Sequence, residues 1–321
     1  MGLAVAKILI TGANGFVGRV VCETLRLRHH EIVPTTRARV QPSDVPIGDL
    51  SLKTDWGNAL NGCDAVIHLA ARVHVMTESK SGSLAAFRLI NVDATLNLAR
   101  QAIDAGVRRF VYVSSIKVNG ESTSANPFSP FVVPDPLDAY GISKYEAEIA
   151  LRDLAQQTGL ELVIVRPPLV YGPGVRANFL RLLQFVHAGL PLPLSAIRNK
   201  RSMVAVENLA DLLIVCCVHP AAAGNTLCVS DDADLSTPDL LRMLAKAMGK
   251  PARLFSLPAS VVSFIATLAG RSQEASRLLD SLQVDITSTK SLLGWHPVIS
   301  VQDAIDKTVA DFLARCYPSN S

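Results

Sequence analysis

The sequence has few charged and few aromatic residues, and neither sign of charge dominates. Of its 321 residues, 18% are charged and 5% aromatic, whereas 49% are hydrophobic. Disordered chains show the opposite balance, so we expect a folded protein. The formal net charge of +3 is also too small for a general nucleic-acid binder, whose domain would be strongly basic. We therefore expect no nucleic-acid partner, and an anionic ligand would have to be met by a few local cations.

Long apolar runs, a leader segment and paired cysteines are also missing. The most membrane-like segment, 257–270, is shorter than the roughly 20 residues that a spanning helix needs. We predict no membrane span and interpret this segment as a buried helix or a partner surface. The N-terminal stretch lacks the charged start of a secretory signal. No CxxC spacing occurs, so we interpret all the cysteines as reduced core residues of a cytoplasmic protein. These are Cys22, Cys63, Cys216, Cys217, Cys228 and Cys316.

Short apolar runs alternate with amphipathic stretches through the first two thirds of the chain. This pattern is typical of a parallel sheet covered by helices on both faces. The predicted strands are 7–11, 31–35, 65–70, 110–114 and 162–166, with a weaker one at 45–47, and the predicted helices are 18–28, 85–105 and 140–158. We predict an α/β fold with a Rossmann-type, doubly wound parallel sheet.

The regular alternation stops at a Pro/Gly-rich segment after Arg166. A helix at 207–218 and a run at 226–229 could then rejoin the sheet. Thr237, as an N-cap, and a final helix at 301–315 indicate a smaller, mainly helical C-terminal lobe. We predict a discontinuous Rossmann domain of 1–168 and 202–231, and a second, smaller lobe of 169–201 and 232–321.

Three glycines, Gly12, Gly15 and Gly18, lie between the first predicted strand and the first helix. Such a turn lets backbone N–H groups approach a pyrophosphate at the positive end of the helix. Glycine spacing alone could mark an ordinary tight turn. The order strand, turn and helix favours dinucleotide binding.

The end of the second strand bears on the choice of coenzyme. NAD-selective folds carry an acidic residue there, but this chain has Thr36 and Arg37. A guanidinium can bind a 2′-phosphate, so we favour NADP(H) and keep NAD(H) possible. Arg37 could equally be a solvated loop residue. Asp49, after the third strand, could accept a hydrogen bond from the adenine amino group.

Tyr140 and Lys144 open a predicted helix with the spacing Y-x-x-x-K, which places both on one face. A nearby ammonium lowers the pKa of a tyrosine towards neutrality and makes it a usable acid/base. Ser115 follows a predicted strand and could donate to the reacting oxygen. These three residues are the candidate catalytic group.

The segments TGANGFVG, HLAA, YVSSIKVNGE, YGISKYEAE and RPPLVYGPG together resemble the extended short-chain dehydrogenases/reductases. More narrowly, the chain resembles the NAD-dependent epimerase/dehydratase family that acts on nucleotide sugars. This resemblance implies that Ser115, Tyr140 and Lys144 form a catalytic triad. It implies coenzyme contacts at Gly12, Gly15, Phe16, Val17, Gly18, Asp49, Leu50, Leu69, Ala70, Ala71, Tyr140, Lys144 and Pro167.

The resemblance also implies a nucleotide-sugar site. Asn178 and Arg201 would contact the sugar diphosphate, with a second arginine at Arg277 or, less surely, Arg271. Leu192 would line the base. Lys117 stands where sugar epimerases carry a small or hydroxylic residue, and it could bind a substrate carboxylate, acetamido oxygen or phosphate. Solvated surface roles remain open for Lys117 and for both C-terminal arginines.

The leading functional expectation is a UDP-4-keto-hexosamine 4-reductase of bacterial surface-polysaccharide biosynthesis. A UDP-glucose or UDP-GlcNAc 4-epimerase with the same triad is the alternative. A reductase of a non-sugar ketone, or a catalytically silent NADP-binding sensor, fits less well. His68 and His74 are interpreted as inert, and we predict no metal site. The resemblance further implies a homodimer that pairs the helices 85–105 and 140–158.

Overall fold

The computed structural model describes residues 6–73 and 80–317. Its larger part is a seven-stranded parallel sheet in the order β3-β2-β1-β4-β5-β6-β9. The strands are β1 (Lys7–Thr11), β2 (Glu31–Thr36), β3 (Val45–Pro46), β4 (Ala65–His68), β5 (Arg109–Val113), β6 (Glu161–Arg166) and β9 (Thr226–Cys228). The order reverses between β1 and β4, and in such sheets ligands bind outside the carboxyl ends of the strands at that point. The predicted Rossmann-type sheet is confirmed, including the return of β9 beside β6.

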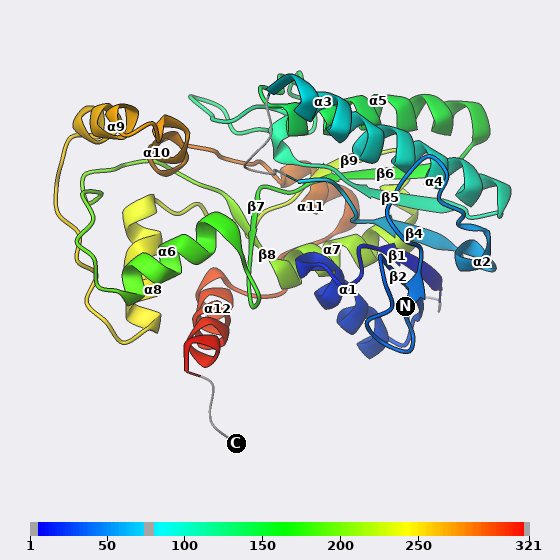
Figure 1. Ribbon diagram of the computed structural model, residues 1–321, viewed down its shortest axis with the longest axis horizontal. Coiled ribbons are helices and arrows are strands. Elements are labelled where there is room, and N and C mark those ends of the chain that lie inside the picture. The colour runs from blue at the N-terminus through cyan, green and yellow to red at the C-terminus, as the bar shows by residue number, and fades with distance from the viewer. Residues whose placement is uncertain (1–5, 74–79, 318–321) are drawn as a thin grey trace.

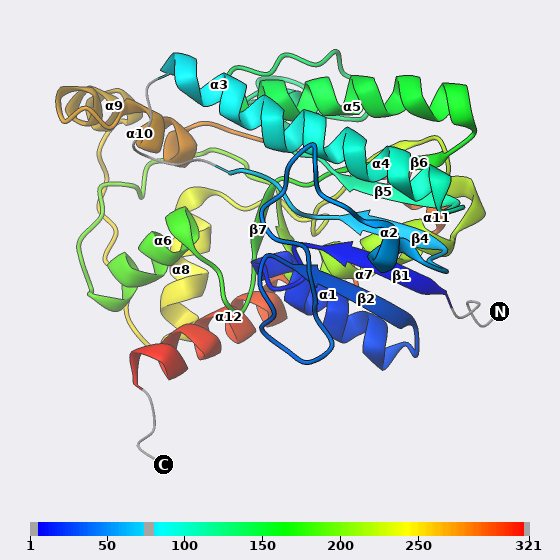
Figure 2. The ribbon, with the colours of Figure 1, turned by 45° about the vertical axis from the view of Figure 1, so that its right-hand side comes forward.

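Helices cover both faces of this sheet (Figures 1 and 2). One face packs against α1 (Phe16–Leu27) and α7 (Val206–Val218), and the other against α4 (Ala94–Asp104) and α5 (Ala139–Thr158). The short α2 (Gly57–Leu60) belongs to the second layer, and α11 (Thr287–Leu293) packs near β9. Because apolar layers lie on both sides, the central strands read as continuous apolar runs in the sequence.

A smaller lobe lies beyond the carboxyl ends of the strands (Figure 1). Its two-stranded parallel sheet pairs β7 (Leu169–Tyr171) with β8 (Met203–Ala205). Its helices are α6 (Ala177–His187), α8 (Thr237–Ala247), α9 (Ala259–Leu268), α10 (Ser272–Leu279) and α12 (Val301–Cys316). Phe179, Leu244 and Phe312, from three of these helices, share a second apolar core. The predicted mainly helical lobe is confirmed.

The helix predicted at 85–105 is not continuous. It comprises α3 (Lys80–Arg88), a π-helical segment (Leu89–Asp93) and α4. The wider π turn inserts an extra residue and rotates the residues before it relative to α4. As a result Leu89 is exposed, whereas Leu96 of α4 packs against the core.

Two local predictions were wrong, and for the segment 257–270 one of the two predicted alternatives, burial, is excluded. Ser236, not Thr237, caps α8, because the Ser236 hydroxyl accepts from the Asp239 N–H while the Thr237 hydroxyl donates to the Leu278 carbonyl. Cys316 is exposed at the last turn of α12, which extends past the core, although the other five cysteines are buried as predicted. The apolar segment around α9 is not a buried helix, since no residue of α9 is buried, and all ten are described.

Among the described residues, no helix combines the length and apolarity that crossing a membrane would require. His74, predicted to be inert, lies outside the described residues. Leu282, Val284, Ile286, Leu293 and Trp295 pack in the core of the Rossmann sheet, although they follow the helices of the smaller lobe in the sequence. The chain therefore passes repeatedly between the two cores.

Candidate active site

The turn that contains Gly12, Gly15 and Gly18 brings the backbone atoms of neighbouring segments unusually close together. Gly12 has a φ of +66°, and a Cβ there would lie 3.3 Å from the Ala70 backbone. A Cβ on Gly18 would overlap the Gly12 carbonyl oxygen and lie 2.8 Å from the Ala13 Cα. The turn is closed by the Gly15 N–H, which donates to the Gly12 carbonyl at 2.9 Å. A side chain at either position would displace the turn that a dinucleotide approaches.

The first turn of α1 offers an open, positive helix end. Its N-cap is Gly15, which has no side chain to cap the helix, and its first turn holds no acidic residue. Phe16, Val17 and Gly18 form this turn, so their amide groups and the helix dipole are available to an anion. These features fit the pyrophosphate of the predicted coenzyme.

The loop after β4 is fixed to the glycine turn through Thr11. The Thr11 hydroxyl accepts from the N–H groups of Leu69 and Ala70, both at 3.0 Å, and lies 2.8 Å from His68 Nδ1. His68 Nε2 lies 2.9 Å from the Thr95 hydroxyl. Burial, with the charge of Lys144 adding to it, lowers the pKa of His68 to about 3. His68 is therefore a neutral, hydrogen-bonded core residue, as interpreted from the sequence.

Arg37 and Asp49 lie together at the ends of β2 and β3. The Arg37 Nε is 2.8 Å from the Asp49 carboxylate, and both side chains are exposed. The Gly48 N–H donates to the Arg37 carbonyl at 3.1 Å, which holds the two strand exits side by side. Thr36 is buried, and Leu50 follows Asp49 into the same loop. The structure thus joins two residues for which the sequence predicted separate coenzyme contacts.

The predicted triad comes together where β5 and α5 meet. Ser115 follows β5, and Tyr140 and Lys144 occupy the first two turns of α5. The Lys144 ammonium donates to the Val113 carbonyl at 2.8 Å and lies 6.0 Å from the centre of the Tyr140 ring. Ser115 and Tyr140 are hydrogen-bonded through their side chains. Pro167, at the end of β6, accepts from the N–H of Ile116 and so borders the same site.

The pKa values of the triad differ from the simple expectation. Burial raises the pKa of Tyr140 to about 12; the Asp138 charge adds to this and the Ser115 hydrogen bond opposes it. Burial lowers the pKa of Lys144 to about 7, against the opposing charge of Glu148. The sequence predicted a lowered Tyr140 pKa. Burial outweighs that effect, because Lys144 is itself only partly charged near neutral pH.

Asn91 fixes the start of α5 from the π-helical segment. Its side chain bonds both backbone groups of Arg72, accepting from the N–H at 2.8 Å and donating to the carbonyl at 3.1 Å. It also donates to the Ser143 hydroxyl at 2.9 Å, which in turn donates to the Tyr140 carbonyl at 2.8 Å. Sequence analysis missed Asn91, because a helical pattern does not reveal a π turn.

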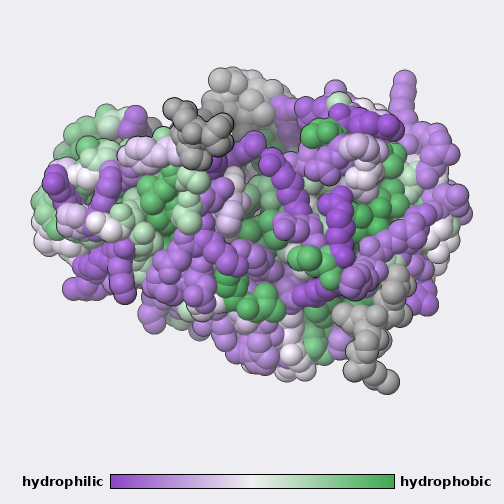
Figure 3. Space-filling model, turned by 90° about the horizontal axis from the view of Figure 1, so that it is seen from below, coloured by the Kyte–Doolittle hydropathy of each residue, from purple (hydrophilic) through white to green (hydrophobic). Residues whose placement is uncertain are grey.

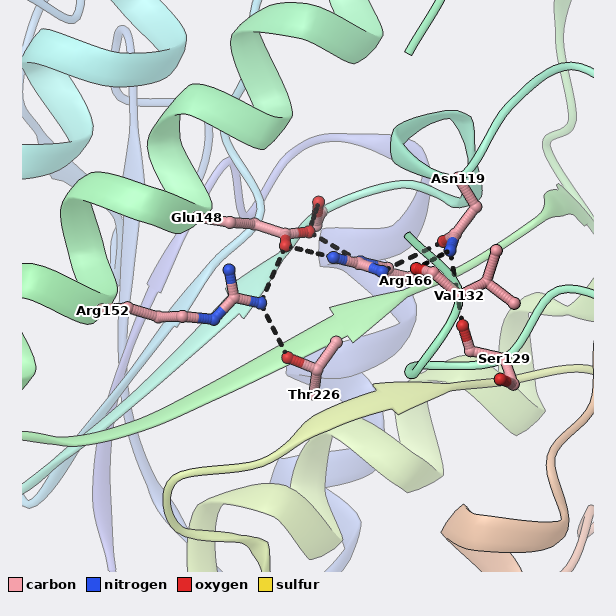
Figure 4. Close-up of polar contacts among 8 residues, drawn as sticks. Asn119, Ser129, Val132, Glu148, Arg152, Arg166 and Thr226 are labelled. Atoms are coloured by element: carbon pink, nitrogen blue, oxygen red, sulfur yellow. Dashed lines mark hydrogen bonds and ion pairs between the residues drawn. The ribbon is translucent and has the colours of Figure 1, made fainter. Parts of the chain in front are cut away.

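A buried ion pair behind the triad was also missed (Figure 4). Glu148, one turn after Lys144 in α5, binds Arg166 of β6 through two hydrogen bonds of 2.9 and 2.6 Å. It also accepts from the Ser114 hydroxyl at 2.6 Å. Two signals were readable: an acid on the helix face of Lys144, and an arginine that ends an otherwise apolar buried strand.

Lys117 faces carboxylates of its own chain. Its ammonium is hydrogen-bonded to Glu121 at 2.7 Å and to Asp138, and the side chain is half-buried. Asp138 caps α5 by accepting from the Gly141 N–H at 2.7 Å. Lys117 therefore ties the loop that carries Ser115 to the start of the helix that carries Tyr140. Its predicted contact with substrate stays a prediction.

Two of the arginines predicted to bind a diphosphate lie near each other in the smaller lobe. Burial lowers the pKa of Arg201, the Asp280 carboxylate opposes this, and the charge of Arg277 adds to it. Arg201 also donates to the Asp280 carbonyl at 3.0 Å. Two cations whose charges act on each other favour the binding of an anion nearby.

The other predicted substrate residues lie in the same lobe. Asn178 is the second residue of α6, half-buried, as expected for a residue that opens this helix. Leu192 is half-buried; its N–H donates to the Arg253 carbonyl at 2.9 Å, and its carbonyl accepts from the Phe255 N–H at 3.0 Å. Arg271 is exposed at the start of α10. Their contacts with substrate remain predictions.

Comparisons with known proteins agree with this arrangement. The sequence model of the NAD dependent epimerase/dehydratase family matches residues 8–229. A UDP-glucose 4-epimerase of Vibrio cholerae is 43% identical over 315 residues, which cover 96% of this chain and 95% of that protein.

Solved structures show the same fold. A UDP-glucuronic acid 4-epimerase from Bacillus cereus in complex with NAD matches with a TM-score of 0.79 over 98% of each chain, at 21% identity. A UDP-glucose 4-epimerase from Thermotoga maritima with UDP-glucose gives a TM-score of 0.76, covering 97% of this chain and 100% of that one, at 20% identity. At these identities, the likeness concerns the fold alone.

Gly18→Ala should weaken coenzyme binding by roughly tenfold or more, because the added methyl group overlaps the Gly12 carbonyl and moves the turn. Isothermal titration with NAD and NADP measures the effect. Gly57→Ala is the matched control, since a Cβ there meets only the Asp55 side chain at 3.3 Å. Equal affinities of Gly18→Ala and wild type would contradict the prediction that the glycine turn binds the coenzyme.

Lys144 should make stability depend on pH. Its folded pKa is about 7, whereas a lysine in an unfolded chain titrates near 10.4. Between these values the unfolded chain binds the additional proton, so raising the pH stabilises the folded protein by up to about 1.4 kcal/mol per pH unit. Urea denaturation from pH 7 to 9 should show wild type gaining stability relative to Lys144→Met. The exposed Lys53→Met is the control, and parallel curves for Lys144→Met and wild type would refute the prediction.

Glu148→Gln should destabilise the protein by about 3–5 kcal/mol, because it leaves the buried Arg166 guanidinium without its counter-charge. Glu146→Gln, two residues away, breaks an ion pair with Arg88 at the surface, where solvent screens the charges, and should cost far less stability. The free energy of unfolding in urea measures both. Similar losses in the two variants would rule out a special role for the buried pair.

Proposed function

The chain belongs to the NAD-dependent epimerase/dehydratase family, and on that premise we propose that it is a UDP-sugar 4-epimerase that uses NAD(H). The observation that carries the proposal is the meeting of Ser115, Tyr140 and Lys144 at the carboxyl ends of the strands, beside the glycine turn. The 43% identity to a UDP-glucose 4-epimerase supports both the reaction type and UDP-glucose as the first substrate to test.

The coenzyme would be held by the turn from Gly12 to Gly18 and by the loop of Leu69, Ala70 and Ala71. When bound, it supplies the acceptor and donor of a hydride at C4 of the sugar. Its pyrophosphate would lie at the N-terminus of α1, where neither a cap side chain nor an acid competes.

Tyr140 moves the proton. It takes the proton of the C4 hydroxyl as C4 becomes a carbonyl, and it returns a proton to the carbonyl oxygen after the sugar has presented its other face. Ser115, hydrogen-bonded to Tyr140, donates to the same oxygen. The ammonium form of Lys144 favours the phenolate that Tyr140 needs in order to accept a proton.

The sugar diphosphate would lie between Arg201 and Arg277, whose like charges act on each other. Planar guanidinium groups bind phosphate oxygens in pairs. Asn178, at the start of α6, would add an amide contact, and Leu192 an apolar one to the base. These assignments rest on the resemblance of the chain to the family. They also rest on the position of all four residues in the smaller lobe.

The NAD(H) proposal follows from the pairing of Arg37 and Asp49. β2 does not end in an acidic residue, but the Asp49 carboxylate lies 2.8 Å from Arg37 and so occupies the space near the end of β2. A 2′-hydroxyl could donate to this carboxylate, whereas a 2′-phosphate would be repelled by it. The sequence favoured NADP(H) because of the charge of Arg37, and that preference remains the alternative.

A UDP-4-keto-hexosamine 4-reductase is the second candidate. It uses the same triad, and only the unpaired charge expected for Arg37 favoured it over the epimerase. Because Asp49 pairs with Arg37, that argument for an NADPH-consuming reductase is weaker. The division into two domains, the homodimer and the cytoplasmic location also remain predictions, and light scattering would test the dimer.

The deciding experiment incubates the protein with UDP-glucose, with UDP-GlcNAc and with a UDP-4-keto-6-deoxy-N-acetylhexosamine, each with NAD(H) or NADP(H). We expect conversion of UDP-glucose to UDP-galactose without net change in coenzyme absorbance at 340 nm, a general property of reduced nicotinamide. Stoichiometric loss of that absorbance with the keto sugar, and no epimerisation, would replace the epimerase by the reductase.

Tyr140→Phe provides the control for this assay. It removes the proton carrier and should lower turnover by at least about 100-fold, while coenzyme affinity stays close to that of wild type. Tyr145→Phe, on the next turn of α5, is the matched control and should keep full activity. Equal turnover of Tyr140→Phe and wild type would remove Tyr140 from the mechanism.

A further inference from the structure

The outer face of α9 is apolar and exposed. Val261, Phe264, Ile265 and Leu268 have the spacing i, i+3, i+4 and i+7, so they share one side of the helix. Their exposed fractions are 40%, 65%, 54% and 74%. We refer to these four residues as the α9 face. A contiguous apolar face of this kind on a soluble lobe points to an interaction surface.

The orientation of this face is fixed by the rest of the lobe. Val262, on the flank of α9 next to this face, packs against the apolar core that α6, α8 and α12 share. The Arg271 N–H donates to the Ala266 carbonyl at 2.8 Å, so the chain turns directly from α9 into α10. Figure 1 shows α9 and α10 at the outer end of the lobe, away from the Rossmann sheet. The α9 face therefore belongs to a helix at the end of the smaller lobe, remote from the sheet.

The segment around α9 is also strongly cationic. No carboxylate occurs between Asp239 and Glu274, a stretch that includes α9 and most of α8. Its cations are Arg242, which is paired with Asp239 at 2.8 Å, and Lys246, Lys250, Arg253 and Arg271. Arg253 and Arg271, which bracket the apolar part, are both exposed, as is Phe255 between them. Figure 3 shows, from below, apolar and polar surface interspersed over the underside of the molecule, the side opposite to the one on which α9 lies in Figure 1.

From these observations we propose that the α9 face docks on an anionic lipid bilayer. A short amphipathic helix with an apolar side and flanking cations binds in the plane of the membrane interface, because apolar side chains enter the acyl boundary while cations meet anionic headgroups. With ten residues, α9 can lie in the interface but cannot span it. A second copy of the chain fits less well, since pairing two α9 faces would bring two clusters of like charge together.

Vesicle flotation of the full-length protein tests the proposal. Phosphatidylcholine vesicles with phosphatidylglycerol should bind the protein roughly tenfold more tightly than vesicles of phosphatidylcholine alone, and added salt should weaken the binding. The absence of binding to the anionic vesicles would overturn the proposal. Binding that is equal with both lipids and insensitive to salt would also overturn it, because the cations would then play no part.

Matched variants test whether the α9 face is the surface that binds the vesicles. The double variant Phe264→Ser, Leu268→Ser should lose at least about tenfold in vesicle affinity and keep wild-type epimerase activity on UDP-glucose. Phe131→Ser with Leu27→Ser, which removes an exposed phenylalanine and an exposed leucine elsewhere, should bind as wild type does. Equal losses in both double variants, or no loss in either, would refute the role of the α9 face.

Two further measurements complete the test. Phe264→Trp places an indole on the α9 face, while the native Trp56 and Trp295 are buried. Its emission should shift to the blue with anionic vesicles, and an unchanged spectrum would contradict insertion. Light scattering of wild type and of the Phe264→Ser, Leu268→Ser variant should give the same mass. A lower mass for the variant would identify the face as a contact between copies and overturn the membrane proposal.

Discussion

The ion pair of Glu148 and Arg166 is the constraint on which the candidate active site depends. Both side chains are almost completely buried, and they join α5 to β6 through two hydrogen bonds. Replacing a buried pair by apolar residues often costs no stability, so its value here is better sought in geometry than in net free energy. Two hydrogen bonds to one carboxylate fix both the position of α5 along the strand and its rotation about the helix axis. That position carries Tyr140, two turns before Glu148, and Lys144, one turn before it.

The same pair extends towards the other half of the site. Ser114 donates to Glu148, so the strand end that presents Ser115 is fixed to the same carboxylate as the helix. Arg166 reaches onward to the Asn119 side chain at 3.1 Å, in the loop that follows Ser115. Lys117 adds a second tie between this loop and α5 through Asp138. The acid/base group is therefore positioned by charges that need not touch the substrate.

Much of this could be predicted from sequence because the signals are local. The apolar runs, the Gly12-Gly15-Gly18 spacing and the Tyr140-Lys144 spacing each depend on a few neighbouring residues, and they located the sheet, the turn and the triad. The π-helical segment was not predictable in this way, because it differs from a helix by one inserted residue. The pairing of Arg37 with Asp49 joins two strand exits that are separated in the sequence, and the proposal of NAD(H) rests on it. The Tyr140 pKa depends on burial, which a single sequence does not report.

The course of the chain between the two apolar cores has a mechanical consequence. It leaves the Rossmann core after β6, returns at α7, leaves again after β9, comes back for Trp295 and ends in α12 in the smaller lobe. Two bodies joined by one strand can swing about a single hinge, but bodies joined by several crossings cannot rotate without bending every connection. The two lobes should consequently behave as one stiff frame, and access to the sugar site would depend on loops that border it. In such a frame, a surface at the far end of the small lobe keeps a fixed direction relative to the strand ends where the chemistry takes place.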